Sequence, residues 1–296
     1  MNTSKKLSQL LNNSKELVID DNSKIIIMSD CHRGYDTWGD DFSRNENIFL
    51  AALSYYYTNS YTYVEVGDGD DLWENKSLSK IIETHKDVFS LLYMFDRMNR
   101  LYLLFGNHDI VKKKECINHS LVYNNGNIER YMLLFKDICV DEALVLRYLP
   151  TNDRILITHG HQGDFLNDKI WKVSRFLVRY LWHPLELIGI KNPTSAASSI
   201  NKKLSVEGKL KEWTDKNKQM LIAGHTHRPV FPKVGEPLYF NDGCCVHPRY
   251  VTGIEIADGD ISLIKWSIKT RMDQSLFVAK EALFGPIKLK DYFDNL

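Results

Sequence analysis

Five short polar motifs, each at the end of an apolar run, constrain the fold of this chain most strongly. The apolar runs read KIIIMS, YTYVEV, LYLLF, RILIT and QMLIA, and they are rich in the β-branched and bulky residues typical of strands. The motifs that follow them are Asp30-Cys31-His32, Gly67-Asp68-Gly69-Asp70-Asp71, Gly106-Asn107-His108-Asp109, His159-Gly160-His161 and Gly224-His225-Thr226-His227. Strands that deliver polar side chains at their carboxyl ends commonly build a site on an α/β scaffold. The sequence therefore predicts an α/β protein with one polar site at the edge of its sheets.

The order of the expected elements differs between the two halves of the chain. The first half alternates strands and helices, which favours right-handed crossovers and a parallel sheet. The second half has short strands separated by turn residues, which is typical of a sheet completed by antiparallel strands. Two packed sheets with outer helices fit this order. The helices are expected over residues 4–17, 44–59 and 77–98, and the strands over 24–29, 61–66, 100–105, 121–123, 133–139, 143–149, 153–158, 236–241, 250–256 and 261–268.

Residues 162–218 separate the fourth motif from the fifth, and we expect them to form a helical cap beside the site. Their first part is unusually aromatic, with Trp171, Phe176 and Tyr180, and their later part is basic and polar. With 296 residues the chain is long enough for one large domain and marginal for two. We therefore expect a single domain over residues 1–296 that contains this insert.

Charge and cysteine usage exclude several classes of protein. Lys+Arg and Asp+Glu both number 38, and this balance argues against a dedicated nucleic-acid-binding protein. No apolar stretch of about 18 residues predicts a transmembrane helix, and the N-terminal segment lacks the apolar core of a secretory signal. The 5 cysteines form no C-x-x-C pair, which is typical of reduced cysteines in the cytosol. We expect a soluble cytoplasmic protein, with peripheral membrane contact through the cap left open.

The first motif is suited to bind one metal ion. Asp30 and His32 lie on the same side of an extended segment, so both can reach a single ion, whereas alternation directs Cys31 away from them and into the core. Carboxylate and imidazole groups are usual ligands of hard or borderline divalent ions. Asp70 and Asp109, in the second and third motifs, are interpreted as capping or supporting groups rather than as ligands.

The remaining motifs supply ligands for a second ion. A carboxylate from a neighbouring strand can bridge two ions, and Asp68 is the expected bridge. Asn107 offers a neutral oxygen from the third strand. His159, His225 and His227 complete the ligand shells, and two imidazoles two residues apart in a G-H-x-H turn can serve neighbouring ions. The sequence therefore predicts seven ligands for two ions.

Such a centre predicts hydrolysis of a phosphate ester. Two ions about 3.5–4 Å apart activate a hydroxide that attacks phosphorus. The leaving oxygen needs a proton, for which His108 is the expected general acid and Asp71 its partner. Arg33 and Arg228 flank ligands and are predicted to contact phosphate oxygens. His161 is interpreted as a substrate contact or a supporting group rather than a ligand.

The five motifs resemble those of the calcineurin-like metallophosphoesterases, which read D-x-H, G-D-x-x-[DE], G-N-H-[DE], an H-G block and G-H-x-H. They span about two-thirds of the chain. The resemblance implies a four-layer αββα sandwich of the α/β (α+β) class, with two mixed β-sheets flanked by helices and a helical cap insert. It also implies two divalent or trivalent metal ions, usually Mn, Fe or Zn. The residues that it implies are Asp30, His32, Asp68 and His227 for one ion, Asp68, Asn107, His159 and His225 for the other, and His108 with Asp71 for the acid dyad.

The insert at 162–218 resembles the cap of one branch of this family, the UDP-2,3-diacylglucosamine pyrophosphatases. Those enzymes typically read G-D-x-F-[DE] and G-N-R-D at the second and third motifs. This chain has Asp70 in place of the Phe and His108 in place of the Arg. These departures align the chain with the general phosphoesterase pattern.

Three hypotheses about function follow. The first is a metal-dependent phosphoesterase that hydrolyses a phosphomonoester or phosphodiester bond of a phosphorylated small molecule, nucleotide or phosphoprotein. The second is a pyrophosphatase of the UDP-2,3-diacylglucosamine type, with the acyl chains held by the aromatic cap. The third is a catalytically silent metal-binding scaffold that recruits partners through the cap. The complete set of ligands together with His108 favours an enzyme.

Overall fold

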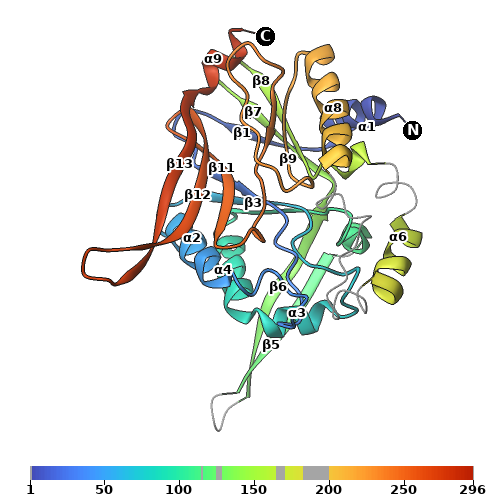
Figure 1. The fold of residues 1–296 in the computed structure, drawn as a ribbon, viewed down its shortest axis with the longest axis vertical. Coiled ribbons are helices and arrows are strands. Elements are labelled where there is room, and N and C mark those ends of the chain that lie inside the picture. Colours follow the sequence, from blue (N-terminus) through green and yellow to red (C-terminus); the bar gives the residue numbers. More distant parts are fainter. Residues whose placement is uncertain (1, 115, 125–128, 165–170, 183–199, 296) are drawn as a thin grey trace.

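Two β-sheets packed face to face form the body of the protein (Figure 1). The computed structural model describes residues 2–114, 116–124, 129–164, 171–182 and 200–295. The strands are β1 Lys15–Ile19, β2 Ile25–Met28, β3 Thr62–Val66, β4 Leu101–Leu104, β5 Cys116–Asn124, β6 Glu129–Asp141, β7 Ala143–Tyr148, β8 Asp153–Thr158, β9 Met220–Ala223, β10 Tyr239–Asn241, β11 Tyr250–Ala257, β12 Asp260–Thr270 and β13 Leu276–Lys288. The smaller sheet has the order β1-β7-β8-β9-β10, and the larger has the order β13-β12-β11-β2-β3-β4-β6-β5. Both contain parallel and antiparallel pairs, as predicted.

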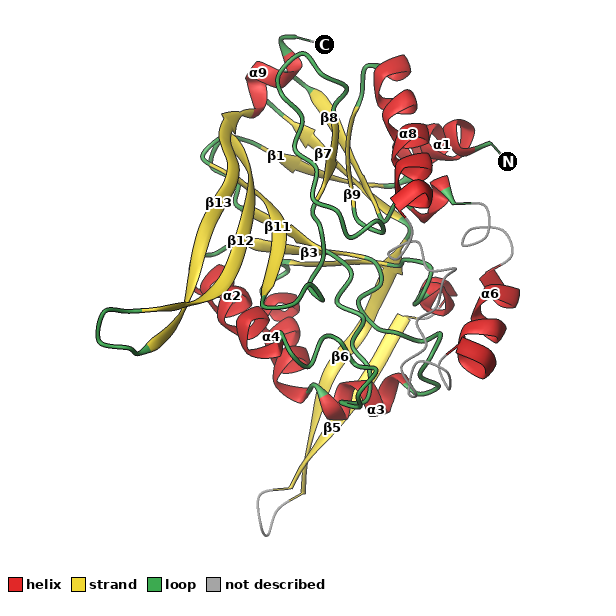
Figure 2. Ribbon diagram, viewed as in Figure 1, coloured by secondary structure: helices red, strands yellow, loops and turns green. Residues whose placement is uncertain are grey.

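Helices cover the outer face of each sheet (Figure 2). Helices α1 Thr3–Asn13 and α8 Ile200–Asn217 pack on the smaller sheet, and α2 Glu46–Thr58 and α4 Lys86–Arg97 pack on the larger one. The other helices of the described residues are α3 Leu78–Thr84, α6 Trp171–Leu177 and α9 Leu289–Phe293, with helical turns η1 Ile110–Lys114, η2 His161–Gly163 and η3 Val178–Trp182. Alternation along β2 explains the layers, because Ile27 packs between the sheets whereas Ile26 packs with α2 and α4. Leu156 of β8 likewise faces α1 and α8. The predicted αββα sandwich is confirmed.

The N-terminal helix is shorter than expected. Helix α1 ends at Asn13, and residues 15–19 instead form β1, which pairs in parallel with β7. The expectation of a helix over 4–17 is therefore wrong beyond residue 13. The last residues of the segment, Val18 and Ile19, are β-branched, and pairing with a sheet edge outweighs the weak helical pattern.

The expected helix over 77–98 is divided into α3 and α4 at His85. The side chain of His85 is fully buried, and its ring nitrogens lie 3.0 Å from Asp40 Oδ2 and 3.3 Å from Glu46 Oε2. Asp40 also accepts the backbone N–H groups of Gly34 and Asp36. His85 therefore ties the break between the two helices to the loop that follows the first motif.

Stability is expected to depend on the proton held by His85. Burial lowers the pKa of this imidazole, but Asp40 and Glu46 outweigh burial and raise the pKa from 6.5 to about 9. A raised pKa contributes stability that is fully present below pH 6.5 and is lost as the pH rises through 9, and the contribution is up to about 3 kcal/mol. We expect the stability difference between wild type and His85→Gln, measured by urea unfolding, to shrink from pH 6.5 to 9.5. A difference that stays constant over this range would contradict the charged pair.

The C-terminal part contains a strand that the sequence pattern did not reveal. Strand β13 pairs antiparallel with β12 along most of its length, and the β12–β13 hairpin extends beyond the body of the sheets (Figure 1). Residues 276–288 show little alternation of buried and exposed positions. An edge strand that is mostly exposed carries no apolar alternation from which it could be recognised.

Part of the interval expected to form the cap lies outside the described residues, namely 165–170 and 183–199. Of the remainder, α8 packs on the smaller sheet through Val206, Leu210 and Trp213. Helix α6 and turn η3 contain several exposed apolar side chains. The extent of the cap over 162–218 stays a prediction. Among the described residues, no helix is both long and apolar enough to cross a membrane.

Candidate metal centre

The ends of five strands bring the five motifs to one place. Strands β2, β3 and β4 are parallel neighbours in the larger sheet, and β8 and β9 are parallel neighbours in the smaller one. Parallel neighbours end at the same edge of a sheet. The loops continue this pairing, because Asp30 N donates to Gly67 O and Gly224 N donates to His159 O. His225 N donates to Asp30 Oδ2 at 2.9 Å and so joins the edges of the two sheets.

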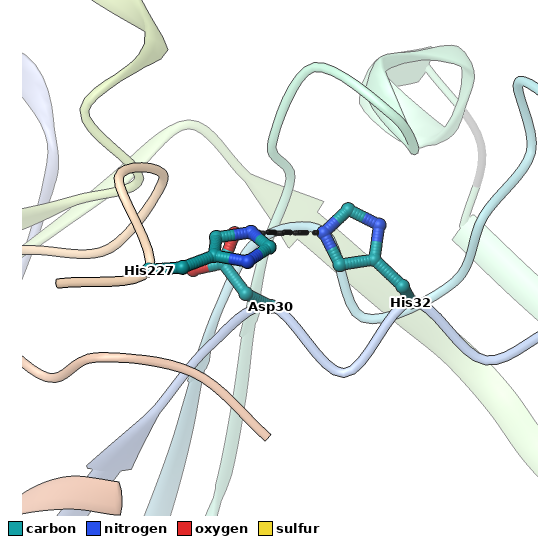
Figure 3. Close-up of side chains that lie close together, drawn as sticks. All are labelled: Asp30, His32 and His227. Carbon is teal, nitrogen blue, oxygen red and sulfur yellow. Dashed lines mark hydrogen bonds and ion pairs between the residues drawn. The ribbon is translucent and has the colours of Figure 1, made fainter. Parts of the chain in front are cut away.

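Asp30, His32 and His227 form the first cluster of candidate ligands (Figure 3). One potential ligand atom from each lies within 4.8 Å of the others. His227 Nε2 lies 3.0 Å from Asp30 Oδ1 and 3.3 Å from His32 Nε2. The two imidazoles point toward one another beside the carboxylate (Figure 3). This donor set fits one borderline divalent ion.

Asp68, His159 and His225 form the second cluster, which is entirely buried. Asp68 Oδ2 lies 3.1 Å from His159 Nε2 and 3.9 Å from His32 Nε2, so one carboxylate reaches both clusters. Asn107 is buried beside them, and the backbone N–H of the next residue, His108, donates to Asp68 Oδ1 at 2.7 Å. The predicted ligands thus gather in two groups that meet at Asp68.

Several candidate ligand atoms are buried without a hydrogen bond to the described protein. They are Asp30 Oδ1, Asn107 Oδ1, His159 Nε2 and His225 Nε2, and of these Asp30 Oδ1 and His159 Nε2 have the ion-pair contacts with His227 and Asp68 given above. Buried polar atoms are nearly always hydrogen-bonded, and exceptions call for an explanation such as a bound ion. Two carboxylates, one amide and four imidazoles also match the chemistry of Mn, Fe or Zn. The residues present therefore fit a pair of such ions.

Local backbone strain supports the same interpretation. Asp30, His32, Asp68, His225 and His227 all have positive φ angles, between 49° and 68°. This left-handed region is uncommon for residues other than glycine and is often found at functional sites. It also corrects the expected reason for the burial of Cys31, which is fully buried in the core although its neighbours are not extended.

Close approach of the motifs requires glycine at position 67. Gly67 has a φ of 79°, and a Cβ there would lie 2.5 Å from Gly106 N and 2.8 Å from the His159 ring. A side chain would therefore push apart the second, third and fourth motifs. The glycine allows the backbone of β3 to turn against the next strand end.

Asp71 and His108 form a pair at the edge of the centre. Asp71 Oδ1 lies 3.1 Å from His108 Nδ1, and Asp71 Oδ2 lies 3.7 Å from His32 Nδ1. The indole of Trp73 stacks on the His108 imidazole, with ring centroids 4.5 Å apart and planes at 20°. His108 is therefore held between a carboxylate and an aromatic face.

Opposite charges govern ionisation throughout the centre. Burial alone would raise the pKa of Asp30, but the charges of His227 and His159 outweigh it and hold the pKa well below its ordinary value. In return, Asp30 overcomes burial and raises the pKa of His227 to about 10. Burial opposes the charges of Asp71 and Asp68 at His108, which nevertheless raise its pKa. Because metal ligands must be deprotonated, ions would displace the protons of the ligand imidazoles.

Arg33 does not face the centre as predicted. Its guanidinium has a side-chain exposure of 1% and donates to both oxygens of Glu65, at 2.7 and 2.8 Å, and to Asp70 Oδ1 at 2.7 Å. This placement contradicts the predicted contact with phosphate, because the fork is directed into the protein. Its position directly after a ligand was the only basis for that prediction.

A second buried cation supports the loops that carry Asp68 and Asn107. Lys112 Nζ lies 2.9 Å from Asp109 Oδ2 and also binds Asp70 Oδ2 at 2.5 Å. Asp109 Oδ1 in turn accepts the backbone N–H groups of Gly106 and Asp68. Asp109 and Asp70 thus hold neighbouring motifs together, as their interpretation as supporting groups predicts.

Two residues suggested as substrate contacts occupy different surroundings. Arg228 pairs with Glu207 of α8, yet its side chain is 46% exposed. His161 is buried beside His159, with ring centroids 5.6 Å apart. Burial and the neighbouring charges of His159 and His225 lower the pKa of His161 well below its ordinary value. Arg228 stays a proposed phosphate contact, whereas the burial of His161 beside His159 favours its role as a supporting group.

Sequence reasoning missed a buried group behind Asp30. Ser29 Oγ hydrogen-bonds Asp30 Oδ2 and lies 2.8 Å from Asp242 Oδ1, within hydrogen-bond distance. Burial, with the charge of Asp30, raises the pKa of Asp242 well above its ordinary value. Asp242 directly follows β10, so the rule that revealed the five motifs could also have found it. Asp164, buried 3.8 Å from His225 Nε2, was missed because no motif includes it.

Comparison with solved structures finds Vps29 from Chaetomium thermophilum, with 10% sequence identity and a TM-score of 0.34 over 88% of this chain and 96% of that chain. Vps29 from the same organism, complexed with the RaPID-derived cyclic peptide RT-D3, has 11% identity and a TM-score of 0.34 over 88% and 95% of the two chains. Such low TM-scores support no argument about this protein. No curated protein matches the chain. Residues 23–229, however, match the model of the calcineurin-like phosphoesterases, and this match covers all five motifs. The chain therefore belongs to the calcineurin-like phosphoesterase family.

Proposed function

We propose that this protein is a metal-dependent phosphoesterase that hydrolyses a phosphomonoester or phosphodiester bond. The observation that carries the proposal is the contact between the first ligand cluster and the Asp71–His108 pair. The His32 and His108 rings lie edge to face with centroids 4.6 Å apart. A proton donor therefore stands directly beside the residues that would hold the ions, which is the arrangement that protonation of a leaving oxygen needs.

The proposed roles follow from the family membership and from the donor atoms. Asp30, His32 and His227 would hold one ion, and Asp68 would share that ion with a second one. Asn107, His159 and His225 complete the proposed set. Divalent ions held there would supply Lewis-acid stabilisation of the phosphoryl oxygens and would lower the pKa of a water molecule.

Proton transfer is the part that this chain's own side chains perform. Asp71 Oδ1 lies 3.1 Å from His108 Nδ1, and this ion-pair contact would hold the ring and leave Nε2 to donate to the leaving oxygen. Asp71 and Asp68 favour the protonated imidazole, since both raise the pKa of His108. Because the pair touches the reaction only when the leaving group departs, its contribution should depend on how basic that group is.

Substrate would approach from the side of His32, His108 and His227. These side chains retain 15%, 21% and 17% exposure, whereas those of His159, Asp68 and Asp30 retain at most 2%. The buried ligands would thus fix the ions from behind. Arg228, half exposed next to His227, is the proposed contact for a phosphate oxygen on this side.

One observation bears on the pyrophosphatase alternative. Val173, Phe176 and Tyr180 of α6 and η3 are each more than half exposed. A substrate with an apolar part would cover such side chains and gain from their burial. Turnover of detergent-dispersed UDP-2,3-diacylglucosamine would support this alternative. Turnover of small esters but not of UDP-2,3-diacylglucosamine would exclude the pyrophosphatase alternative.

The proposed activity is tested with p-nitrophenyl phosphate and bis(p-nitrophenyl) phosphate. We expect Mn²⁺-loaded protein to hydrolyse at least one of them, EDTA to reduce the rate to that of buffer, and added Mn²⁺ to restore it. On phenyl phosphate, whose leaving oxygen is more basic than p-nitrophenolate, His108→Ala should be slower than wild type, whereas His247→Ala, which removes an exposed imidazole outside the centre, should not. If metal-loaded wild type, metal-loaded His108→Ala and buffer alone all hydrolysed every ester at the same rate, the result would instead support the catalytically silent scaffold.

A further inference from the structure

The loop after β3 holds the acid pair through its backbone amides. Asp71 Oδ1 accepts the N–H groups of Trp73 and Glu74, each at 3.0 Å, while it lies 3.1 Å from His108 Nδ1. The same loop places the buried Trp73 indole flat against the His108 ring. Both groups that orient His108 therefore depend on the conformation of residues 71–75.

The carbonyl side of this loop is bound by one side chain from a distant part of the sequence. Arg179, in turn η3, donates from Nη2 to Leu72 O at 2.6 Å and to Asn75 O at 3.2 Å. Its Nε donates to Trp73 O at 2.8 Å. These three bonds to backbone carbonyls are charge-assisted, which makes them stronger than neutral hydrogen bonds.

A second contact joins the same two segments. Lys76 Nζ lies 5.8 Å from the centre of the Tyr180 ring, within the range of a cation–π interaction. Elsewhere on this segment the guanidinium of Arg175 lies over the Trp171 ring, 5.2 Å from its centre. Arg179 is therefore the residue of η3 that hydrogen-bonds the backbone of the loop carrying Asp71 and Trp73.

We propose that Arg179 is a positioning residue that fixes the Asp71–His108 acid by bracing the 71–75 loop. The inference rests on the proposed function and adds to it a role for η3. A guanidinium presents its N–H donors in a rigid plane, so one side chain can bind three carbonyls, whereas a lysine ammonium has no such fork. Without the brace the loop can move, and a displacement of about 1 Å at a reacting group can cost about 100-fold in rate.

Esters with different leaving groups test this role. The p-nitrophenolate of p-nitrophenyl phosphate is a weak base that leaves without much help from an acid, whereas the leaving oxygen of phenyl phosphate is more basic. We expect Arg179→Met to lower kcat for phenyl phosphate by roughly 10- to 100-fold and kcat for p-nitrophenyl phosphate by less than about threefold. Arg179→Lys should restore little, and the control Arg175→Met should resemble wild type for both esters.

A double variant shows whether Arg179 acts through the acid. If it does, Arg179→Met combined with His108→Ala should be no slower than His108→Ala alone. Additive losses, or equal losses for the two esters, would overturn the inference, since they would indicate a direct substrate contact or a general loss of structure. The inference would also be overturned if His108→Ala lost more activity on phenyl phosphate than on p-nitrophenyl phosphate while Arg179→Met had the kcat of wild type for both esters. That result would leave the proposed function intact.

Hydrogen exchange tests the brace without any turnover. The amides of Trp73 and Glu74, which donate to Asp71, should exchange faster in Arg179→Met than in wild type or Arg175→Met. Unchanged exchange would overturn the inference. Faster exchange in a protein that hydrolyses no ester would retain the structural role of Arg179 and remove the proposed function instead.

Discussion

Replacement of Asp68 with asparagine is expected to lower kcat/KM for phosphate esters by at least about 1,000-fold, because the loss of several kcal/mol of charge stabilisation at a metal centre has this effect on rate. Asp68 is the carboxylate that reaches both candidate ligand clusters, with Oδ2 3.1 Å from His159 and 3.9 Å from His32. Asparagine keeps the shape of the side chain but removes the charge that two cations would share. Activity assays and elemental analysis of the purified variant measure the effect.

The control for this experiment is Asp215→Asn, which removes an exposed carboxylate from the surface of α8. It should leave both the rate and the bound metal unchanged. Asp68→Asn should retain less metal than wild type because it weakens both predicted sites. Full activity of Asp68→Asn with wild-type metal content would show that Asp68 does not bridge two ions.

The layers of the fold could be predicted from the sequence because the buried strands are apolar runs of clear length and pattern. Strands β2, β3 and β8 are short apolar runs that end in polar motifs, and the helix between β2 and β3 favours their parallel pairing. The wrong boundaries lie where tertiary contacts decide. Strand β1 forms because β7 offers an edge to pair with, and the break at His85 stabilises a buried ion pair with Asp40. Neither partner is near in sequence.

The candidate centre was predictable because its ligands follow one rule, a polar residue at the carboxyl end of a strand. The orientation of the side chains next to these ligands was harder to predict from the sequence. Arg33 and Arg228 both flank ligands, yet one is buried in an ion pair and the other is half exposed. Sequence adjacency does not give the direction of a side chain when the backbone adopts left-handed angles, as it does at Asp30 and His32. Arg179 was also missed, because its partners are backbone carbonyls that no motif describes.

The buried position of Arg33 predicts the largest change in stability. Its guanidinium balances Glu65 and Asp70, and the exposures of the three side chains are 1%, 3% and 2%. Removing one partner of a buried ion pair leaves an uncompensated charge, which typically costs about 3–5 kcal/mol. We therefore expect Arg33→Met to lower the free energy of unfolding by this amount in urea titrations.

A matched surface variant separates this effect from the loss of any arginine. Arg44 is 58% exposed and lies 3.7 Å from Asp41, and such surface pairs contribute about 1 kcal/mol or less. Arg44→Met should therefore change the unfolding free energy little, and adding Glu65→Gln to Arg33→Met should recover part of the loss because it removes the orphaned charge. If Arg33 instead bound phosphate, Arg33→Met would unfold like wild type and would raise KM. The buried ion pair thus predicts that Arg33→Met lowers the free energy of unfolding, whereas a phosphate contact predicts that it raises KM.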